Sequence, residues 1–194
     1  IVEDILYNYN LNPNRNNWDD SSEKKPIKSQ LHLSYGDDSN EFKQINYSKL
    51  IPVYIKKITN FLNEIPFKTP VKFSFTIENY TCIKNNHYMR EHLHPECHFT
   101  GIHYLKFDKD EHYPTAFTNT HNHANFSESL FPVLLEKLDM TKSENSWIYE
   151  AYNMNTHEDD FIITPSIVEH YVPFHSNCKN HRITIAINIS IDKD

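Results

Sequence analysis

Histidine is the residue best suited to metal chemistry in this chain, which contains 13 histidines in 194 residues. His92 and His94 are separated by one residue in the segment REHLHPECHF. Residues i and i+2 of a strand point to the same side, so both imidazoles would face one ion. A chain so rich in histidine can contain an HxH pair by chance, however. The prediction of a metal site therefore depends on a third ligand from a distant segment.

A second histidine segment, ITPSIVEHYVPFHSNCKNHRITIAINIS, offers that ligand. His170 follows a Pro-Ser turn and leads into a strand, and Arg182 lies twelve residues later on the terminal strand. Two alternatives stay open. A structural zinc site with Cys97 lacks the second CxxC or HxxxH pair that would close it. A carboxylate ligand is offered by Glu96, in the set His94, Glu96 and His170.

Two segments together resemble a known family. The run YMREHLHP followed by FTGIHYL is similar to the "HxHP…SGVYYL" segment of 2-oxoglutarate/Fe(II) oxygenases, which are related to prolyl 4-hydroxylases and common in phages and marine bacteria. The later run ITPS…EHYVP…RITIAIN resembles the "FPS…PHxVxP…RxSxxxN" segment of the same family. The resemblance covers roughly residues 71–191, in the right order and spacing.

This resemblance implies a mainly β fold, a double-stranded β-helix or jelly roll with covering helices from the N-terminal part. It implies Fe(II) as metal and 2-oxoglutarate as cosubstrate, with O2 and an unidentified small molecule or peptide, such as a prolyl side chain, as the other reactants. The implied metal ligands are His92, His94 and His170. The residues implied to bind 2-oxoglutarate are Arg182, Thr184, Tyr104 and Asn79, of which the arginine suits a carboxylate because its charged fork is fixed.

The chemistry of this class explains the residue types. The iron keeps open positions on one face, where 2-oxoglutarate and oxygen bind together. Oxidative decarboxylation gives succinate and CO2 and supplies the oxidant for a C–H bond of the substrate. The expected enzyme is thus an oxidoreductase, a dioxygenase acting as a hydroxylase. His94 stands where prolyl hydroxylases carry an aspartate, which leaves open whether it is a ligand or supports one.

Two other functions compete with this one. A cupin metalloenzyme shares the jelly roll, but its glycines are missing here and it has no need of Arg182. A non-catalytic jelly-roll module for binding or for virion structure would treat the histidines as incidental. Arg182 separates these hypotheses, because only the oxygenase gives it a defined role after His170.

Length and charge limit the class further. One domain is the simplest organisation of 194 residues, with loop and helical support over 1–70 and the β core over 71–191. A net charge of −7 argues against a nucleic-acid surface, and no apolar run is long enough for a membrane span. Three widely spaced cysteines favour a reducing compartment, so we expect the cytoplasm, or the host cytoplasm for a viral protein. Since the chain begins with Ile1 rather than Met, we expect it to be trimmed there.

Hydrophobic periodicity predicts the elements. Residues 47–65 show the spacing of an amphipathic helix, with Ser48 as its N-cap and Pro52 in its first turn. Alternation over residues 31–35 predicts an edge strand. Residues 129–140 are expected to form either a short helix or an irregular covering segment. Alternation predicts further strands at 71–83, 98–107, 147–154, 159–165, 168–174 and 181–191. Asn79 and Tyr80 would line the pocket, Gly101 would mark a close approach, and Trp147 would lie in the core. Nine further histidines are expected on the surface, in turns or near the site: His87, His98, His103, His112, His121, His123, His157, His175 and His181.

Overall fold

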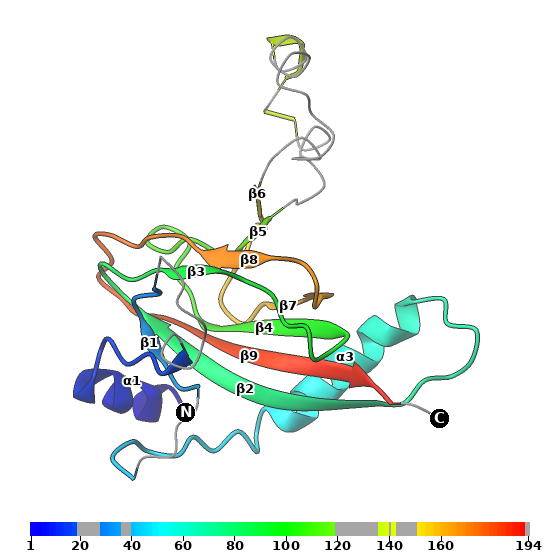
Figure 1. Ribbon diagram of the computed structural model, residues 1–194, viewed down its shortest axis with the longest axis horizontal. Coiled ribbons are helices and arrows are strands. Elements are labelled where there is room, and N and C mark those ends of the chain that lie inside the picture. Colours follow the sequence, from blue (N-terminus) through cyan, green and yellow to red (C-terminus); the bar gives the residue numbers. More distant parts are fainter. Residues whose placement is uncertain (19–27, 36–39, 119–135, 140, 143–150, 193–194) are drawn as a thin grey trace.

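The protein is described here by a computed structural model, which covers residues 1–18, 28–35, 40–118, 136–139, 141–142 and 151–192. Within the described residues, two antiparallel sheets lie face to face, and helices α1 (Val2–Leu11) and α3 (Ile51–Glu64) cover the outer side of the larger sheet (Figure 1). The two long central strands of the larger sheet come from opposite halves of the chain. The two histidine segments meet in the smaller sheet, where neighbouring antiparallel strands pair His92 with His170.

The larger sheet has the strand order β1-β2-β9-β4-β7. Its strands are β1 (His32–Leu33), β2 (Phe73–Ile83), β4 (Phe99–Lys106), β7 (Phe161–Pro165) and β9 (Arg182–Ile191). The predicted strands at 31–35, 71–83, 98–107, 159–165 and 181–191 are confirmed, and β1 is an edge strand as expected. A bulge in β2 between Ile77 and Asn79 shifts its register against β9.

The smaller sheet has the order β3-β8-β5-β6. Its strands are β3 (Met89–His92), β8 (His170–Val172), β5 (Ala116–Thr118) and β6 (Ala151–Asn153). Strand β8 confirms the prediction for 168–174, and β6 matches the described end of the predicted 147–154. Trp147, His121, His123 and most of 129–140 lie outside the described residues.

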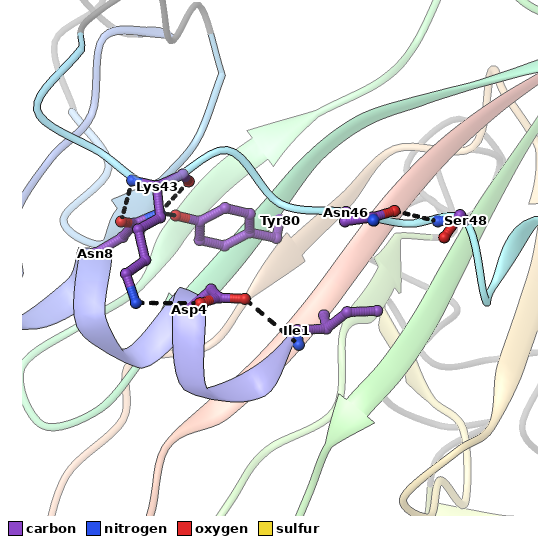
Figure 2. Close-up of polar contacts among 7 residues, drawn as sticks. All are labelled: Ile1, Asp4, Asn8, Lys43, Asn46, Ser48 and Tyr80. Atoms are coloured by element: carbon purple, nitrogen blue, oxygen red, sulfur yellow. Dashed lines mark hydrogen bonds and ion pairs between the residues drawn. The ribbon is translucent and has the colours of Figure 1, made fainter.

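Helix α3 (Ile51–Glu64) packs its apolar face on the larger sheet. Tyr54, Ile58 and Leu62 are buried against the odd-numbered isoleucines of β9. The helix is shorter than predicted, and the N-cap prediction was wrong. Leu50 is the N-cap, while the backbone N–H of Ser48 is bound by the side-chain oxygen of Asn46 in the preceding turn (Figure 2).

Helix α1 (Val2–Leu11) covers the other end of the same face. Its Asn8 is fully buried and donates to the Tyr80 hydroxyl and to the carbonyl of Lys43, both at 2.9 Å (Figure 2). Tyr80 therefore lies on the helix-covered side of β2, and the expectation that it lines the pocket was wrong. Alternation along β2 sends Asn79 to the opposite side.

The inner face of the larger sheet, which looks toward the smaller sheet, carries the polar residues of interest. Partners directly opposite each other share a face, and the register pairs Thr184 with both Thr81 and Tyr104. Arg182 lies on the same face as Thr184, two residues earlier on β9. The small side chain of Ala186 and then Asn188 follow along the same row. One strand thus carries a guanidinium at one end and an amide at the other.

Candidate metal centre

Three imidazoles converge between the sheets. The potential ligand nitrogens of His92, His94 and His170 all lie within 4.8 Å of one another. His92 and His170 are direct partners across the antiparallel pair β3 and β8, and their ring centroids are 4.3 Å apart. His94 lies beyond the end of β3, so the strand argument does not place it. Its position is fixed instead by a backbone hydrogen bond from its N–H to the carbonyl of Ser166, at 3.0 Å.

His92 and His170 are each held in one tautomer. Nδ1 of His92 lies 3.0 Å from the carbonyl of Arg90, and Nδ1 of His170 lies 3.0 Å from the carbonyl of Val168. A carbonyl only accepts, so each Nδ1 carries the proton and each Nε2 presents a lone pair. This arrangement, in which the far nitrogen is bound to the backbone, is typical of histidines that ligate metals.

The imidazoles are neutral near physiological pH. Burial lowers the pKa of His92 to about 3 and that of His170 to about 4, and neighbouring imidazoles add to both effects. Burial also lowers the pKa of His94, although the charge of Glu78 opposes it. Three neutral nitrogen donors at this spacing suit a late first-row divalent metal such as iron. The residues present therefore fit the metal that the sequence resemblance implies.

The alternative ligands are not part of this cluster. Glu96 is exposed and lines the cleft beside His94, but it does not belong to the group of three. The thiol of Cys97 lies 3.7 Å from the carbonyl of His94 and 4.0 Å from the Thr100 hydroxyl.

Arg182 is the most unusual buried group among the described residues. Its side chain is 0% exposed and has no carboxylate partner there. Its Nη2 donates to the hydroxyl of Thr115 at 3.0 Å, and its guanidinium carbon lies 5.1 Å from the ring centroid of Tyr104. Nε and Nη1 are buried without any hydrogen-bond acceptor. Burial lowers the pKa of this guanidinium without making it neutral at any ordinary pH.

A surplus of donors surrounds this arginine. The backbone N–H of Thr115 donates to the Tyr104 hydroxyl at 2.9 Å, which leaves the phenolic proton free for another acceptor. Buried donors without acceptors destabilise a protein, and an unpaired buried charge does so more strongly. An anion with several oxygens would satisfy them all. The site therefore fits a carboxylate, as a bound 2-oxoglutarate would provide.

The other predicted cosubstrate residues take different places. Tyr104 is fully buried beside Arg182, and Thr184 is paired with it across β4 and β9. The Thr184 hydroxyl is 2.6 Å from that of Thr81, so one of the two donates to the other. Asn79 lies instead in the wall of the cleft near the histidines. Thr115 was missed, because a threonine in an irregular segment before β5 has no recognisable pattern.

A cleft of about 200 Å³ opens on His92 and His94. Its other described lining residues are Trp18, Leu33, Tyr35, Glu78, Asn79, Met89, Leu93, Pro95, Glu96 and Asn188. The ring of Trp18 meets that of His92 edge-on, with centroids 5.1 Å apart. A substrate could therefore reach the three histidines from this side.

Several histidines expected on the surface are buried. His87, His112 and His175 are 3%, 4% and 0% exposed. The nitrogens of His175 are both used, since Nδ1 lies 2.8 Å from the Pro173 carbonyl and Nε2 accepts the Tyr113 N–H at 3.1 Å. These histidines are structural because their ring nitrogens bind the backbone of tight turns. His157 is exposed as expected, and His103 lies on the face opposite Tyr104, where it meets the Tyr54 hydroxyl at 2.9 Å.

Comparison with known proteins identifies the family of this chain. Residues 80–188 match the family described as "Putative 2OG-Fe(II) oxygenase", which is more than half of the chain. The chain therefore belongs to the 2OG-Fe(II) oxygenase family, and it is an enzyme that uses Fe(II) and 2-oxoglutarate. No curated protein matches the sequence.

The solved structures that match this chain are distant from it in sequence. A prolyl-4-hydroxylase from Pseudomonas putida has a TM-score of 0.53 at 10% identity, over 97% of this chain and 83% of the other. A 2OG-Fe(II) oxygenase family oxidoreductase from Burkholderia pseudomallei gives 0.49 at 11% identity, over 88% and 73%. Iron-bound HygX from Streptomyces hygroscopicus gives 0.43 at 11%, over 72% and 68%. The first of these supports the fold.

Among the described residues, no helix has both the length and the apolar character that are needed to span a bilayer.

Proposed function

We propose that this enzyme is a 2-oxoglutarate-dependent hydroxylase in which His92, His94 and His170 hold the iron. The observation that carries the proposal is the convergence of three neutral imidazoles, together with a fully buried arginine that has no anionic partner among the described residues. Three neutral ligands leave the double positive charge of the metal unbalanced. A dianionic cosubstrate compensates that charge better than a neutral ligand would.

Arg182 binds the distal carboxylate of 2-oxoglutarate in this proposal. Its unused Nε and Nη1 donate to the carboxylate, and the free proton of Tyr104 adds a third hydrogen bond. Thr115 holds both donors in place, because its hydroxyl accepts from Arg182 and its N–H donates to Tyr104. Thr184, whose hydroxyl is hydrogen-bonded to that of Thr81, lies beside these donors on the inner face of the larger sheet. Asn79 borders the pocket at its metal end.

In this proposal the fold is a jelly roll, which positions the residues of the site. We assign residues 71–191 to the double-stranded β-helix core and 1–70 to its support, within one domain. Helices α1 and α3 cover the outer face of the larger sheet, so the inner face is left for the site. The apolar side chains around Tyr104, including Ile102 and Phe117, exclude water from the cosubstrate end.

When bound, iron with 2-oxoglutarate and O2 supplies the oxidising power to hydroxylate an unactivated C–H bond, with release of succinate and CO2. The residues of the chain bind and orient. The carbonyls of Arg90 and Val168 fix the tautomer of two ligands, and the buried donors orient the cosubstrate. The cleft beside His92 and His94 admits the substrate, which is a peptide side chain or a small molecule.

Anaerobic loading with Fe(II) and 2-oxoglutarate tests this function. The wild-type protein should develop a metal-to-ligand charge-transfer absorption band and, in air, convert 2-oxoglutarate slowly to succinate. His170→Ala should lose both signals, because it removes a ligand. His157→Ala changes an exposed histidine and should keep both. A wild-type protein with neither signal, or an unchanged band in His170→Ala, contradicts the proposal.

A further inference from the structure

The cleft beside the three histidines has acidic and aromatic walls. Glu78 is half-buried and Glu96 exposed, and Trp18 and Tyr35 provide aromatic rings. No lysine or arginine lines it within the part of the chain that the structure describes. Arg90 is stacked on Trp18, with its guanidinium carbon 4.1 Å from the ring centroid, and is not a lining residue. Two independent features thus meet here: a candidate metal centre and an anionic, aromatic cleft that opens onto it.

Both carboxylates are available to a ligand. Neither Glu78 nor Glu96 has an ion-pair partner among the described residues. Glu78 accepts one hydrogen bond, from the Thr76 hydroxyl at 2.5 Å. A carboxylate that is half-buried and unpaired favours a cation beside it.

The negative character of the cleft persists when the site is loaded, an argument that rests on the proposed function. The two positive charges of Fe(II) and the two negative charges of 2-oxoglutarate cancel. Arg182, which binds the distal carboxylate of 2-oxoglutarate in the proposed function, adds one positive charge, and the two negative charges of Glu78 and Glu96 exceed it. Within the described part of the chain, Glu78 and Glu96 are the charged residues that line the cleft, so their carboxylates face an incoming substrate directly.

We propose that the substrate of this enzyme carries an ammonium or guanidinium group, which this cleft binds between Glu78, Glu96 and the aromatic rings. Aromatic faces attract such cations, and the stacking of Arg90 on Trp18 is an example within this cleft wall. The oxidised C–H bond then belongs to the aliphatic chain that joins the cationic group to the rest of the molecule. The same chemistry can come from a free basic amino acid or from a basic side chain in a peptide.

Binding to the anaerobic enzyme with Fe(II) and 2-oxoglutarate tests this inference by calorimetry. Arginine and lysine are compared with citrulline and norleucine, which keep the shape but lack the charge. The peptides Gly-Arg-Gly and Gly-citrulline-Gly distinguish a peptide source from a free amino acid. The variant Glu78→Gln/Glu96→Gln removes both charges, and Glu64→Gln, at the exposed end of α3, is the matched control.

At least one cationic probe should bind about tenfold more tightly than its neutral counterpart, the gain expected of two partly exposed ion pairs. The double variant and 0.5 M salt should both remove this preference, and Glu64→Gln should keep it. Equal binding of charged and neutral probes, no binding of any cation, or an unchanged preference in the double variant would overturn the inference. Titration of 2-oxoglutarate into the same samples separates the outcomes: if it binds and the cations do not, only this inference fails.

Discussion

Replacing Arg182 by methionine should have opposite effects on binding and on stability. The side chain is 0% exposed, has one neutral hydrogen-bond partner and leaves Nε and Nη1 unused. If these donors bind 2-oxoglutarate, Arg182→Met removes one partner of a buried charge pair, which weakens binding by about 2–5 kcal/mol. The dissociation constant should rise between about 30-fold and several thousand-fold. Calorimetric titration of 2-oxoglutarate into the anaerobic Fe(II) enzyme measures this change.

The same substitution should not destabilise the protein without ligand. An apolar side chain in place of a buried charged group is neutral to stabilising, by up to about 4 kcal/mol. The melting temperature of the ligand-free variant should therefore stay or rise by several degrees, at about 2–4 °C per kcal/mol for a chain of this length. Arg15→Met is the control, because Arg15 is also buried but stacks on Phe42, 3.8 Å from its ring centroid. It should lower stability and leave 2-oxoglutarate affinity unchanged.

Two results would refute this reasoning. One is an affinity of Arg182→Met within about threefold of the wild type, which would place the cosubstrate carboxylate elsewhere. The other is a loss of stability equal to that of Arg15→Met, which would mean that Arg182 is satisfied by the protein itself. Iron affinity serves as an internal check and should not change, because all three imidazoles remain.

Further predictions concern acid stability, packing and the cosubstrate clamp, a name used here for Arg182, Tyr104 and Thr115. Thr115→Val deletes the hydroxyl that accepts a hydrogen bond from Arg182, and should weaken the binding of 2-oxoglutarate about tenfold in the same titration. The control Thr118→Val should leave this binding unchanged. Equal affinities of Thr115→Val and the wild type for 2-oxoglutarate would remove Thr115 from the clamp. Burial lowers the pKa of His87 and of His175 to about 4, so the unfolded chain takes up more protons as the pH falls from 6.5 toward 4. The free energy of unfolding in urea should be on the order of 1–2 kcal/mol lower per such histidine at pH 5 than at neutral pH. His175→Gln should reduce this dependence of stability on pH, and an unchanged dependence would mean that His175 titrates normally. Gly101→Ala would place Cβ 2.7 Å from the Phe161 ring, which is stacked on Tyr54, and should destabilise by about 1–3 kcal/mol; Phe161→Leu should restore part of it, and a neutral Gly101→Ala would show that the ring moves freely.

The strands and the long helix could be predicted because their signals are local. Alternation marks β2, β4 and β9, and the 3.6-residue period marks α3. Helix α1 was missed although Val2, Ile5, Leu6 and Tyr9 have helical spacing. It is a short helix without a side-chain cap, and two asparagines lower its helix propensity. Its stability comes from packing and from the buried contacts of Asn8, which no local pattern reveals.

The site could be predicted in part, and for a similar reason. His92, His94, His170 and Arg182 stand in segments with a recognisable order, and the structure brings the three histidines together. Thr115 and the acidic cleft could not be predicted, because they depend on which loops meet in space. The buried histidines were misjudged because a histidine that satisfies turn backbone looks, in sequence, like any surface histidine.

A crystal structure of the protein with Fe(II) and 2-oxoglutarate, grown without oxygen, tests the assignment of ligands most directly. We predict nitrogen atoms of His92, His94 and His170 at about 2 Å from the metal, and a carboxylate of 2-oxoglutarate bound to Nε and Nη1 of Arg182. A metal held by Glu96 in place of His92, or a cosubstrate whose carboxylates do not meet Arg182, would contradict it.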